Sequence, residues 1–326
     1  MIKDKSYKGH IAMLIAGTIW GLNAPIGKAA LLYNNGEISA TSLTLFRMLG
    51  ACILFWIASI FAKKEHVHHE DMLKLFFASL FGVVLNQGSF IYGLKLASPI
   101  DASIVTTTTP IITMIIAALY LKEPITGKKL IGIFFGAAGA LILITSSSHG
   151  GSGARTSNSY IGDLLCLTAQ ISFALYLTLF KDLIMKYSPI TLLKWMFMYA
   201  TICFIPFSYN GASSIPYASL PLKEIGNILF VVVFATFIAY ICIPVGQKLL
   251  RPTVVSMYNY VQPIVASIVA VFMGMDTFGV TKLIAIACVF VGVSFVTKSK
   301  SKAQMDAYLE QKAGKEKEDH ELGPDK

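Results

Sequence analysis

The chain alternates long apolar runs with short polar or charged connections. Each run is continuous over roughly 20 residues, the length that an α-helix needs to cross the hydrocarbon core of a bilayer. Strands of a membrane barrel would instead alternate apolar and polar positions in shorter segments. The pattern therefore predicts an all-α integral membrane protein with ten spans, at 10–32, 40–62, 72–94, 100–121, 130–145, 161–184, 190–209, 225–245, 253–273 and 280–297.

One stretch of the chain occurs twice. The segment 93–139 falls without a gap on 246–292 after a shift of 153 residues, the distance from Gly93 to Gly246. Residues of four kinds coincide, prolines, lysines, glycines and acidic residues: Lys95 with Lys248, Pro110 with Pro263, Glu123 with Asp276, Lys129 with Lys282, and Gly139 with Gly292. The repeat predicts two halves of five spans, and an odd number of spans inserts the second half upside-down relative to the first.

Between the halves lies a Gly/Ser-rich segment with the composition of a flexible linker. The first and last residues of the chain are polar and rich in lysine. We therefore divide the chain into a leader (1–9), a first repeat (10–145), an extracytoplasmic linker (146–160), a second repeat (161–297) and a charged tail (298–326).

Composition agrees with this division and adds an orientation. The residues are 55% hydrophobic and 14% charged, against roughly 25% charged in soluble domains. The net charge of +9 comes from lysines and arginines that gather on one side of the predicted spans, and this side is expected to be cytoplasmic, with both termini. No basic stretch interleaved with aromatic residues is present, so the expected partners are the lipid bilayer and a small-molecule substrate, not nucleic acid.

Motifs for catalysis or metal binding are absent from the sequence. It contains no P-loop, no nucleophile elbow, no HExxH and no CxxC. His66, His68 and His69 lie together in one charged connection, but their spacing fits no standard ligand set and a solvated loop explains them. The sequence thus predicts a protein that is not an enzyme and that holds no metal or cofactor.

The fourth and ninth predicted spans carry the best candidate chemistry. Each has a proline directly after polar residues, and proline removes one backbone hydrogen bond of a helix. The polar neighbours could hydrogen-bond the backbone carbonyl that the proline leaves without a donor, or they could line a cavity. Four consecutive threonines are more than this carbonyl needs. With polar residues of the other spans, the predicted cavity set is Trp20, Asn23, Arg47, Gln87, Thr106, Thr107, Thr109, Pro110, Gln170, Tyr176, Tyr258, Asn259, Gln262 and Pro263.

Charges inside the spans are few. Arg47 lies well inside the second span, and an ionisable residue at depth in a membrane indicates function. Its counterpart in the second half, Lys194, lies nearer the end of its span and can snorkel. No Asp or Glu lies in the middle of a span, so proton coupling through a membrane carboxylate is not predicted.

Glycines four residues apart occur in two spans, Gly17 with Gly21 and Gly132 with Gly136. This spacing allows helices to approach closely. Packing within one chain and a homodimer are both open interpretations.

Three segments resemble the EamA branch of the drug/metabolite transporter superfamily. They are TIWGLNAPIGKAAL in the first span, LTLFRMLGA in the second, and the LKEPIT connection at 121–126 before a glycine-rich span. The resemblance implies a permease of the bacterial inner membrane, usually an exporter of amino acids, metabolites or drugs, that works by alternating access. Two departures limit it: Glu123-Pro124 becomes Asp276-Thr277 in the second half, and the first span lacks the glutamate that small multidrug relatives use for proton exchange.

The main hypothesis is a permease for small polar solutes, anionic or zwitterionic, that Arg47 attracts. A multidrug exporter of cationic aromatic compounds is the alternative within transport, and the lack of a mid-span carboxylate disfavours it. A non-transporting membrane scaffold is the alternative of another class, and the inverted repeat disfavours it.

Overall fold

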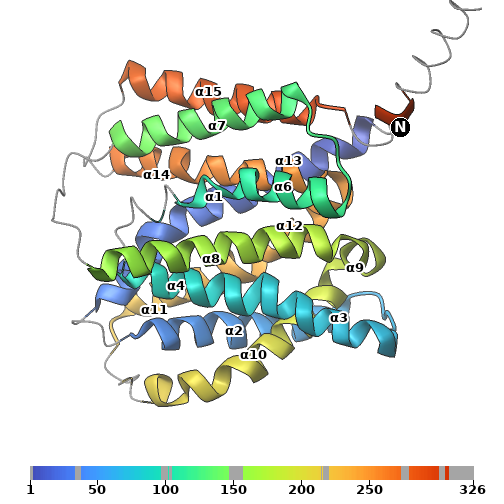
Figure 1. Cartoon of the computed structure of the whole chain (residues 1–326). Helices are drawn as coiled ribbons and strands as arrows, with labels where there is room; N and C mark the ends of the chain where they lie inside the picture. Colours follow the sequence, from blue (N-terminus) through green and yellow to red (C-terminus); the bar gives the residue numbers. More distant parts are fainter. Residues whose placement is uncertain are drawn as a thin grey trace, which may run out of the picture.

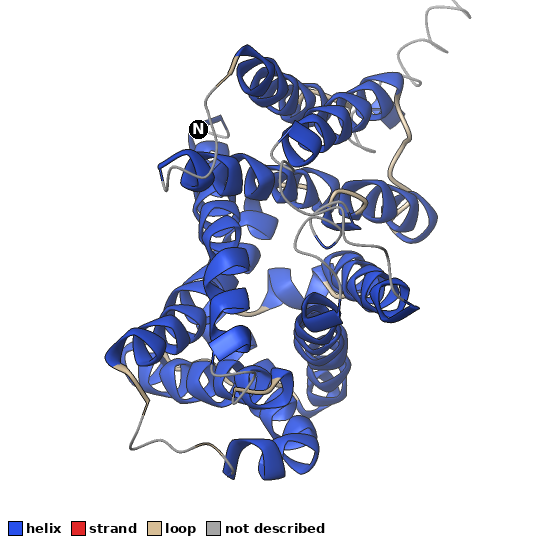
Figure 2. Ribbon diagram, turned by 90° about the vertical axis from the view of Figure 1, so that its left-hand side faces the viewer, coloured by secondary structure: helices blue, strands red, loops and turns tan. Residues whose placement is uncertain are grey.

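Helices make up the regular structure of the computed structural model, and no strand occurs among the residues it describes (Figures 1 and 2). The described residues are 3–33, 38–96, 102, 105–146, 157–213, 215, 220–272, 279–300 and 305–307. The α-helices of the first half are α1 (Lys3–Leu32), α2 (Ala40–Phe61), α3 (His69–Ser79), α4 (Asn86–Leu96), α6 (Thr109–Tyr120) and α7 (Gly127–Ser146). Those of the second half are α8 (Ser157–Leu179), α9 (Lys181–Lys186), α10 (Pro189–Ser213), α11 (Leu222–Leu229), α12 (Ala239–Leu249), α13 (Pro252–Met257), α14 (Val261–Phe272) and α15 (Val280–Thr297).

Two stretches of π-helix join some of these helices into longer ones. The segment η2 (Leu80–Leu85) connects α3 to α4, and η4 (Phe230–Ile238) connects α11 to α12. A 3₁₀ turn, η5 (Tyr258–Tyr260), connects α13 to α14. The shift of 153 residues that relates the two repeats carries residues 80–85 into η4, so the same irregularity occurs at the same place in both halves.

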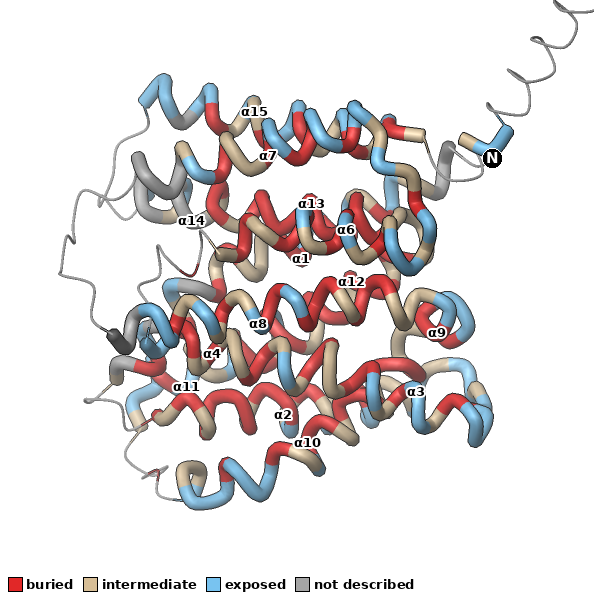
Figure 3. Tube along the Cα trace, in the orientation of Figure 1, coloured by how far each residue is buried: buried red, intermediate tan, exposed pale blue. Residues whose placement is uncertain are grey.

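The helices have the length and surface of membrane spans. Within the described residues, six segments are long and apolar enough to cross a bilayer: Ser6–Leu31, Ala40–Phe61, His69–Leu96, Tyr160–Leu179, Pro189–Ser213 and Leu222–Leu249. Many large apolar residues are exposed, among them Phe61, Phe134 and Phe207 at 86%, 70% and 77%. Exposed positions are frequent on the outer helices α10 and α15, and buried positions prevail between them (Figure 3). An apolar exterior over a buried interior is the arrangement that lipid favours, and it confirms the predicted all-α membrane fold. The count of ten spans stays a prediction.

Some helix ends differ from the predicted ones. Helix α1 begins at Lys3, so it includes residues of the predicted leader. The predicted span 161–184 ends at Leu179, and the chain turns at Phe180 into the separate helix α9. The sequence of α9, KDLIMK, is charged at both ends, so it lies at the end of the bundle. Most of the predicted linker and tail lies outside the described residues.

The two halves pack closely together, and their main contacts have counterparts. Helices α7 and α15 pack together along one side of the bundle, and α2 and α10 pack together along the opposite side (Figure 1). Between these pairs, α4 packs on α8, and the equivalent contact joins α12 to α1. Gly93 of α4 lies against the Gly162 carbonyl, just as Gly246 of α12 lies near the Gly9 carbonyl. The repeat found in the sequence is therefore also present in the packing of the helices.

The paired glycines pack within the chain. A Cβ atom on Gly21 would lie 2.7 Å from Val265 Cβ and 2.9 Å from the Gln262 carbonyl. A Cβ atom on Gly132 would lie 2.7 Å from the Gly292 carbonyl. Because the chain itself occupies these faces, the glycines give no support to a homodimer.

We expect Gly292→Val to destabilise the protein. A Cβ atom at this position would lie 2.5 Å from the Gly132 carbonyl oxygen and 2.7 Å from the Gly136 nitrogen, and backbone atoms cannot turn aside. Overpacking of this kind costs about 1–3 kcal/mol, which a lower thermal unfolding temperature in detergent would show. Gly226→Ala is the control, because nothing lies within 4 Å of its Cβ, and an unfolding temperature for Gly292→Val equal to that of the control would contradict the packing argument.

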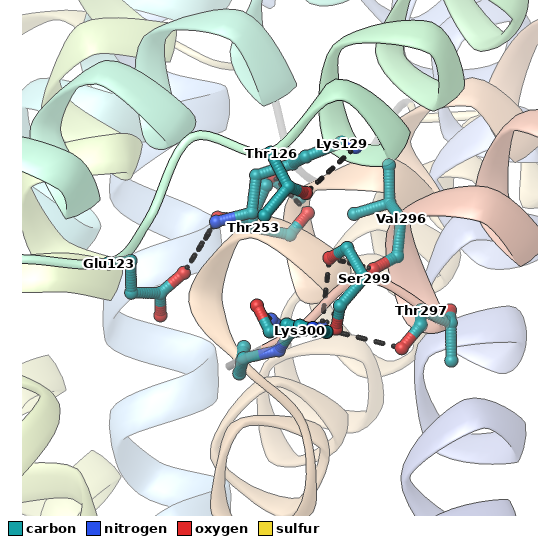
Figure 4. Close-up of polar contacts among 10 residues, drawn as sticks. Glu123, Thr126, Lys129, Thr253, Val296, Thr297, Ser299 and Lys300 are labelled. Atoms are coloured by element: carbon teal, nitrogen blue, oxygen red, sulfur yellow. Dashed lines mark hydrogen bonds and ion pairs between the residues drawn. The ribbon is translucent and has the colours of Figure 1, made fainter. Parts of the chain in front are cut away.

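The connection between α6 and α7 contains a buried ion pair (Figure 4). Lys122 adopts a left-handed conformation with a φ of 52°, and the chain then turns so that Glu123 faces Lys129 of α7. The Glu123 carboxylate and the Lys129 ammonium lie 3.0 Å apart, with side chains that are 6% and 1% exposed. Thr253 of α13 lies 3.4 Å from the same carboxylate oxygen. The LKEPIT segment therefore ties the two repeats together at this end.

Candidate functional site

A polar pocket lies in the interior of the bundle, between helices of both repeats. It holds about 530 Å³ of space not filled by atoms, counting its open part. The side chains that line it are Trp20, Asn23, Arg47, Asn86, Gln87, Phe90, Thr106, Gln170, Phe173, Tyr240, Asn259 and Gln262. They come from α1, α2, α4, α8, α12, η5 and α14, and from the residues just before α6.

Many of these lining residues are related by the internal repeat. The shift of 153 residues pairs Trp20 with Phe173, Gln87 with Tyr240, and Thr106 with Asn259. Trp20 and Phe173 meet edge to face, with ring centroids 5.9 Å apart. The pocket thus lies where the two repeats meet, which is where inverted-repeat transporters bind their substrates.

The π-helices hold side chains in and beside the pocket. A π-helical stretch leaves carbonyl groups without their usual backbone donors, and buried carbonyls need other partners. In η4 the Ala235 carbonyl accepts from Trp20 Nε1 at 3.1 Å. In η2 the Gly82 carbonyl accepts from the Tyr240 hydroxyl at 3.2 Å, and the Phe81 carbonyl accepts from the Ser172 hydroxyl at 2.6 Å. Side chains of one repeat therefore complete the backbone hydrogen bonding of the other.

Arg47 is the charged side chain of the pocket. It is only 4% exposed, and its Nε donates to the Thr236 hydroxyl oxygen at 3.0 Å. No carboxylate among the described residues forms an ion pair with it, and no Asp or Glu lines the described pocket. A buried cation without an anionic partner is costly, so this geometry favours an anionic group on the solute.

Amides beside Arg47 also have unused hydrogen-bonding capacity. Gln87 is 2% exposed, and neither its Nε2 nor its Oε1 atom forms a well-aligned hydrogen bond, although the side chain lies close to the Tyr240 hydroxyl. Asn23 is 4% exposed, and its Oδ1 atom is likewise unpartnered. Buried polar atoms normally find partners, so these three atoms are available to bind polar groups of a ligand.

Some residues of the predicted cavity set lie behind the lining of the pocket. The Thr109 hydroxyl lies 2.7 Å from Gln170 Oε1, so it contacts a lining residue from behind. Tyr176 packs against Gly82, and the Tyr258 hydroxyl bonds to His10 Nδ1 at 2.6 Å. Thr107, Pro110 and Pro263 are buried and do not line the pocket. The prolines instead accompany breaks in the helices, a turn at 107–108 before α6 and the 3₁₀ turn before α14.

Four lining residues were not in the predicted set: Asn86, Phe90, Phe173 and Tyr240. The repeat contained the signal for two of them, because Phe173 and Tyr240 are the counterparts of the predicted Trp20 and Gln87. Asn86 neighbours Gln87. Its Nδ2 donates to the Ala169 carbonyl at 3.0 Å, and its Oδ1 lies 3.1 Å from the Tyr240 hydroxyl, whose single proton it shares with the Gly82 carbonyl. Among the residues that the structure describes, no group of three His, Cys, Asp or Glu side chains could hold a metal ion.

Two repeats around a shared polar pocket, in a bundle with an apolar exterior, define a membrane transport protein. A model of the EamA-like transporter family matches residues 7–145 and 160–298, one match for each repeat. The chain belongs to the EamA-like transporter family.

Several proteins are similar over most of the chain. YetK of Bacillus subtilis, named an uncharacterized transporter, is 26% identical over 94% of this chain and 92% of its own. An uncharacterized transporter of Archaeoglobus fulgidus is 29% identical over 72% of this chain and 78% of its own. Protein WALLS ARE THIN 1 of Arabidopsis thaliana is 24% identical over 95% and 88%. A protein of known crystal structure matches with a TM-score of 0.68 over 90% of this chain and 96% of that one, at 16% identity, and so shares the fold.

Proposed function

We propose that the protein is an alternating-access permease that exports small polar metabolites, amino acids or related solutes, and that the pocket is its solute site. Arg47 binds a carboxylate of the solute, and the free amide atoms of Gln87 and Asn23 bind its other polar groups. The observation that carries the proposal is the buried Arg47 in a pocket whose described lining has no acidic residue. This lining disfavours a multidrug exporter for organic cations, which would need a negative partner.

The membrane location is part of the same proposal. We place the protein in the bacterial inner (plasma) membrane, with both termini in the cytoplasm. The support is the distribution of lysine and arginine, since Lys63, Lys64, Lys128 and Lys248 all lie in or beside connections at the end of the bundle where α1 begins. The named transporters of Bacillus subtilis and Archaeoglobus fulgidus agree with a prokaryotic plasma membrane.

Counterflow in proteoliposomes tests this function. We expect purified protein to exchange labelled amino acids against an unlabelled internal pool. Each amino acid is compared with the amine that lacks its carboxylate, because removal of this group leaves Arg47 unpaired. Loss of a charged hydrogen-bonding partner costs about 1.5–3 kcal/mol, so the amine should compete at least roughly tenfold less well.

Two results would decide against the proposal. If amino acids and the corresponding amines compete equally well, the protein does not recognise the carboxylate. Exchange of amines alone would favour the organic-cation exporter. Empty liposomes and liposomes with heat-unfolded protein are the controls for leakage.

A further inference from the structure

Helix α9 lies at one end of the bundle, between the beginning of α3 and the end of α12 (Figure 1). We call this end of the molecule the α9 end. It also carries the connections 62–68, 121–126 and 250–251, and its basic residues predict that it faces the cytoplasm. The solute pocket lies deeper in the bundle, so solute that leaves on this side must pass the α9 end.

Asp71 of α3 connects the first repeat to the segment that ends α9. It is 3% exposed, and its carboxylate lies 2.5 Å from Lys186 Nζ and accepts from the Tyr187 hydroxyl at 2.7 Å. Lys74 contributes a further contact at 3.1 Å. Charge-assisted hydrogen bonds of this length are among the stronger polar contacts in proteins. In agreement, hydrogen bonding to Asp71 raises the pKa of Lys186, so the ammonium stays protonated.

The same segment is held from its other side by α12. Lys248 Nζ donates to the Tyr187 carbonyl at 2.6 Å. The neighbouring Gln247 side chain donates to the Leu177 carbonyl near the end of α8. Tyr187 therefore joins α3 to α12 through its hydroxyl and its carbonyl. We call Asp71, Lys186, Tyr187 and Lys248 the α9 clasp.

A second contact reinforces the clasp beside it. Glu65, in the connection between α2 and α3, accepts from the Ser188 amide at 2.9 Å. Burial alone would raise the pKa of Glu65, but the hydrogen bonds from Ser188 and Thr191 outweigh it and the pKa is lowered. Glu65 thus stays ionised and binds the residue that follows the clasp.

The two ends of the bundle are not equivalent, although the repeats are. The shift of 153 residues pairs Asp71 with Glu224 at the opposite end, and Lys74 with Asn227. Glu224 is also buried, at 6% exposed, and accepts from Asn227 Nδ2 at 3.0 Å. A lysine contact at the α9 end thus corresponds to a neutral amide contact at the other end.

We propose that the α9 clasp is a gate that holds the α9 end of the solute path closed and must open before solute can pass there. In an inverted-repeat transporter the two ends open in turn, and α3 and α12 must separate for this end to open. They cannot separate while Tyr187 binds both. This proposal rests on the proposed function for one point only, namely that solute passes through the α9 end. Opening of this end can be measured without any solute.

Thiol labelling in oriented membrane vesicles tests the gate. The pocket residue Phe90 is replaced by cysteine in a chain whose five native cysteines are changed to alanine, and a charged, membrane-impermeant thiol reagent is added on the α9 side. We expect Asp71→Asn to raise the labelling rate from this side by about tenfold, because the strongest contacts of the clasp depend on the carboxylate charge. Glu224→Gln is the matched control at the opposite end and should leave this rate unchanged.

A second, milder variant keeps the test decisive if Asp71→Asn does not fold. Lys186→Met removes one partner of Asp71 from a half-exposed position, and it should raise the rate in the same direction by a smaller factor. An unchanged rate in both variants, each monodisperse by gel filtration, would overturn the gate. An equal increase in Glu224→Gln would also overturn it, because the effect would then be a general loosening. If the transport assay fails, the labelling rates of the two variants still decide whether the clasp is a gate.

Discussion

Arg47→Met should greatly slow transport while leaving the protein folded. The guanidinium is the charged group of the described pocket lining, and its loss leaves a solute carboxylate buried without a cation. Truncation of one partner in a buried charge pair costs about 2–5 kcal/mol. Initial counterflow rates at low solute concentration should therefore fall by roughly 30-fold or more. Folding should persist, because methionine fills much of the same space and the empty protein no longer buries an unpaired charge.

The repeat supplies a matched control for this variant. Lys194, the counterpart of Arg47 in the aligned segments, does not line the pocket but lies 5.0 Å above the ring of Trp56. A cation–π contact of this kind contributes about 0.5–1 kcal/mol when exposed, so Lys194→Met should change transport less than about threefold. Equal losses in the two variants would mean that Arg47 acts through the fold and not through the solute.

Arg47→Lys separates charge from geometry. Lysine keeps the cation but loses the planar fork that binds both carboxylate oxygens, and it loses the hydrogen bond from Nε to Thr236. We expect intermediate transport, with weaker apparent affinity for the solute and a smaller change in maximal rate. Full activity of Arg47→Lys would indicate that the charge suffices.

Much of the fold could be predicted from the sequence because lipid leaves few alternatives. The spans follow from the length of the apolar runs, and the architecture follows from the repeat. Residues such as Asn23, Arg47 and Gln87 could be selected because polar groups are rare inside spans and need a reason. The structure brings these three together in one pocket.

Other features could not be predicted, for reasons that differ. The π-helical segment 80–85 reads LFGVVL, which has the composition of any span, so the change in hydrogen bonding has no local signal. The break at Phe180 comes directly before Lys181 and Asp182, but the apolar residues 183–185 that follow them made the predicted span longer than the helix. Asp71 and Glu123 lie next to chain connections and look solvated in the sequence, but the fold buries both. Burial of this kind comes from packing between distant segments, which one sequence does not reveal.

Lys129→Met should destabilise the protein more than the other changes considered. It leaves the Glu123 carboxylate, 6% exposed, without the ammonium that lies 3.0 Å away (Figure 4). Breaking a buried ion pair by removing one partner costs about 3–5 kcal/mol, because the remaining charge stays out of water. We expect a large fall in the thermal unfolding temperature in detergent and a lower yield of monodisperse protein.

The partner variant and the double variant identify the cause of this loss. Glu123→Gln also leaves a buried charge, the Lys129 ammonium, but the new amide oxygen can still accept from Lys129 and Thr253, so this variant should cost less than Lys129→Met. In the double variant Glu123→Gln with Lys129→Met, no charge is buried, and most of the stability lost in Lys129→Met should return. Additive losses would show that the two side chains act separately. Because the pair joins the α6–α7 connection to α13, the recovery of stability would also show that this link between the repeats is maintained by its packing and not by its charge.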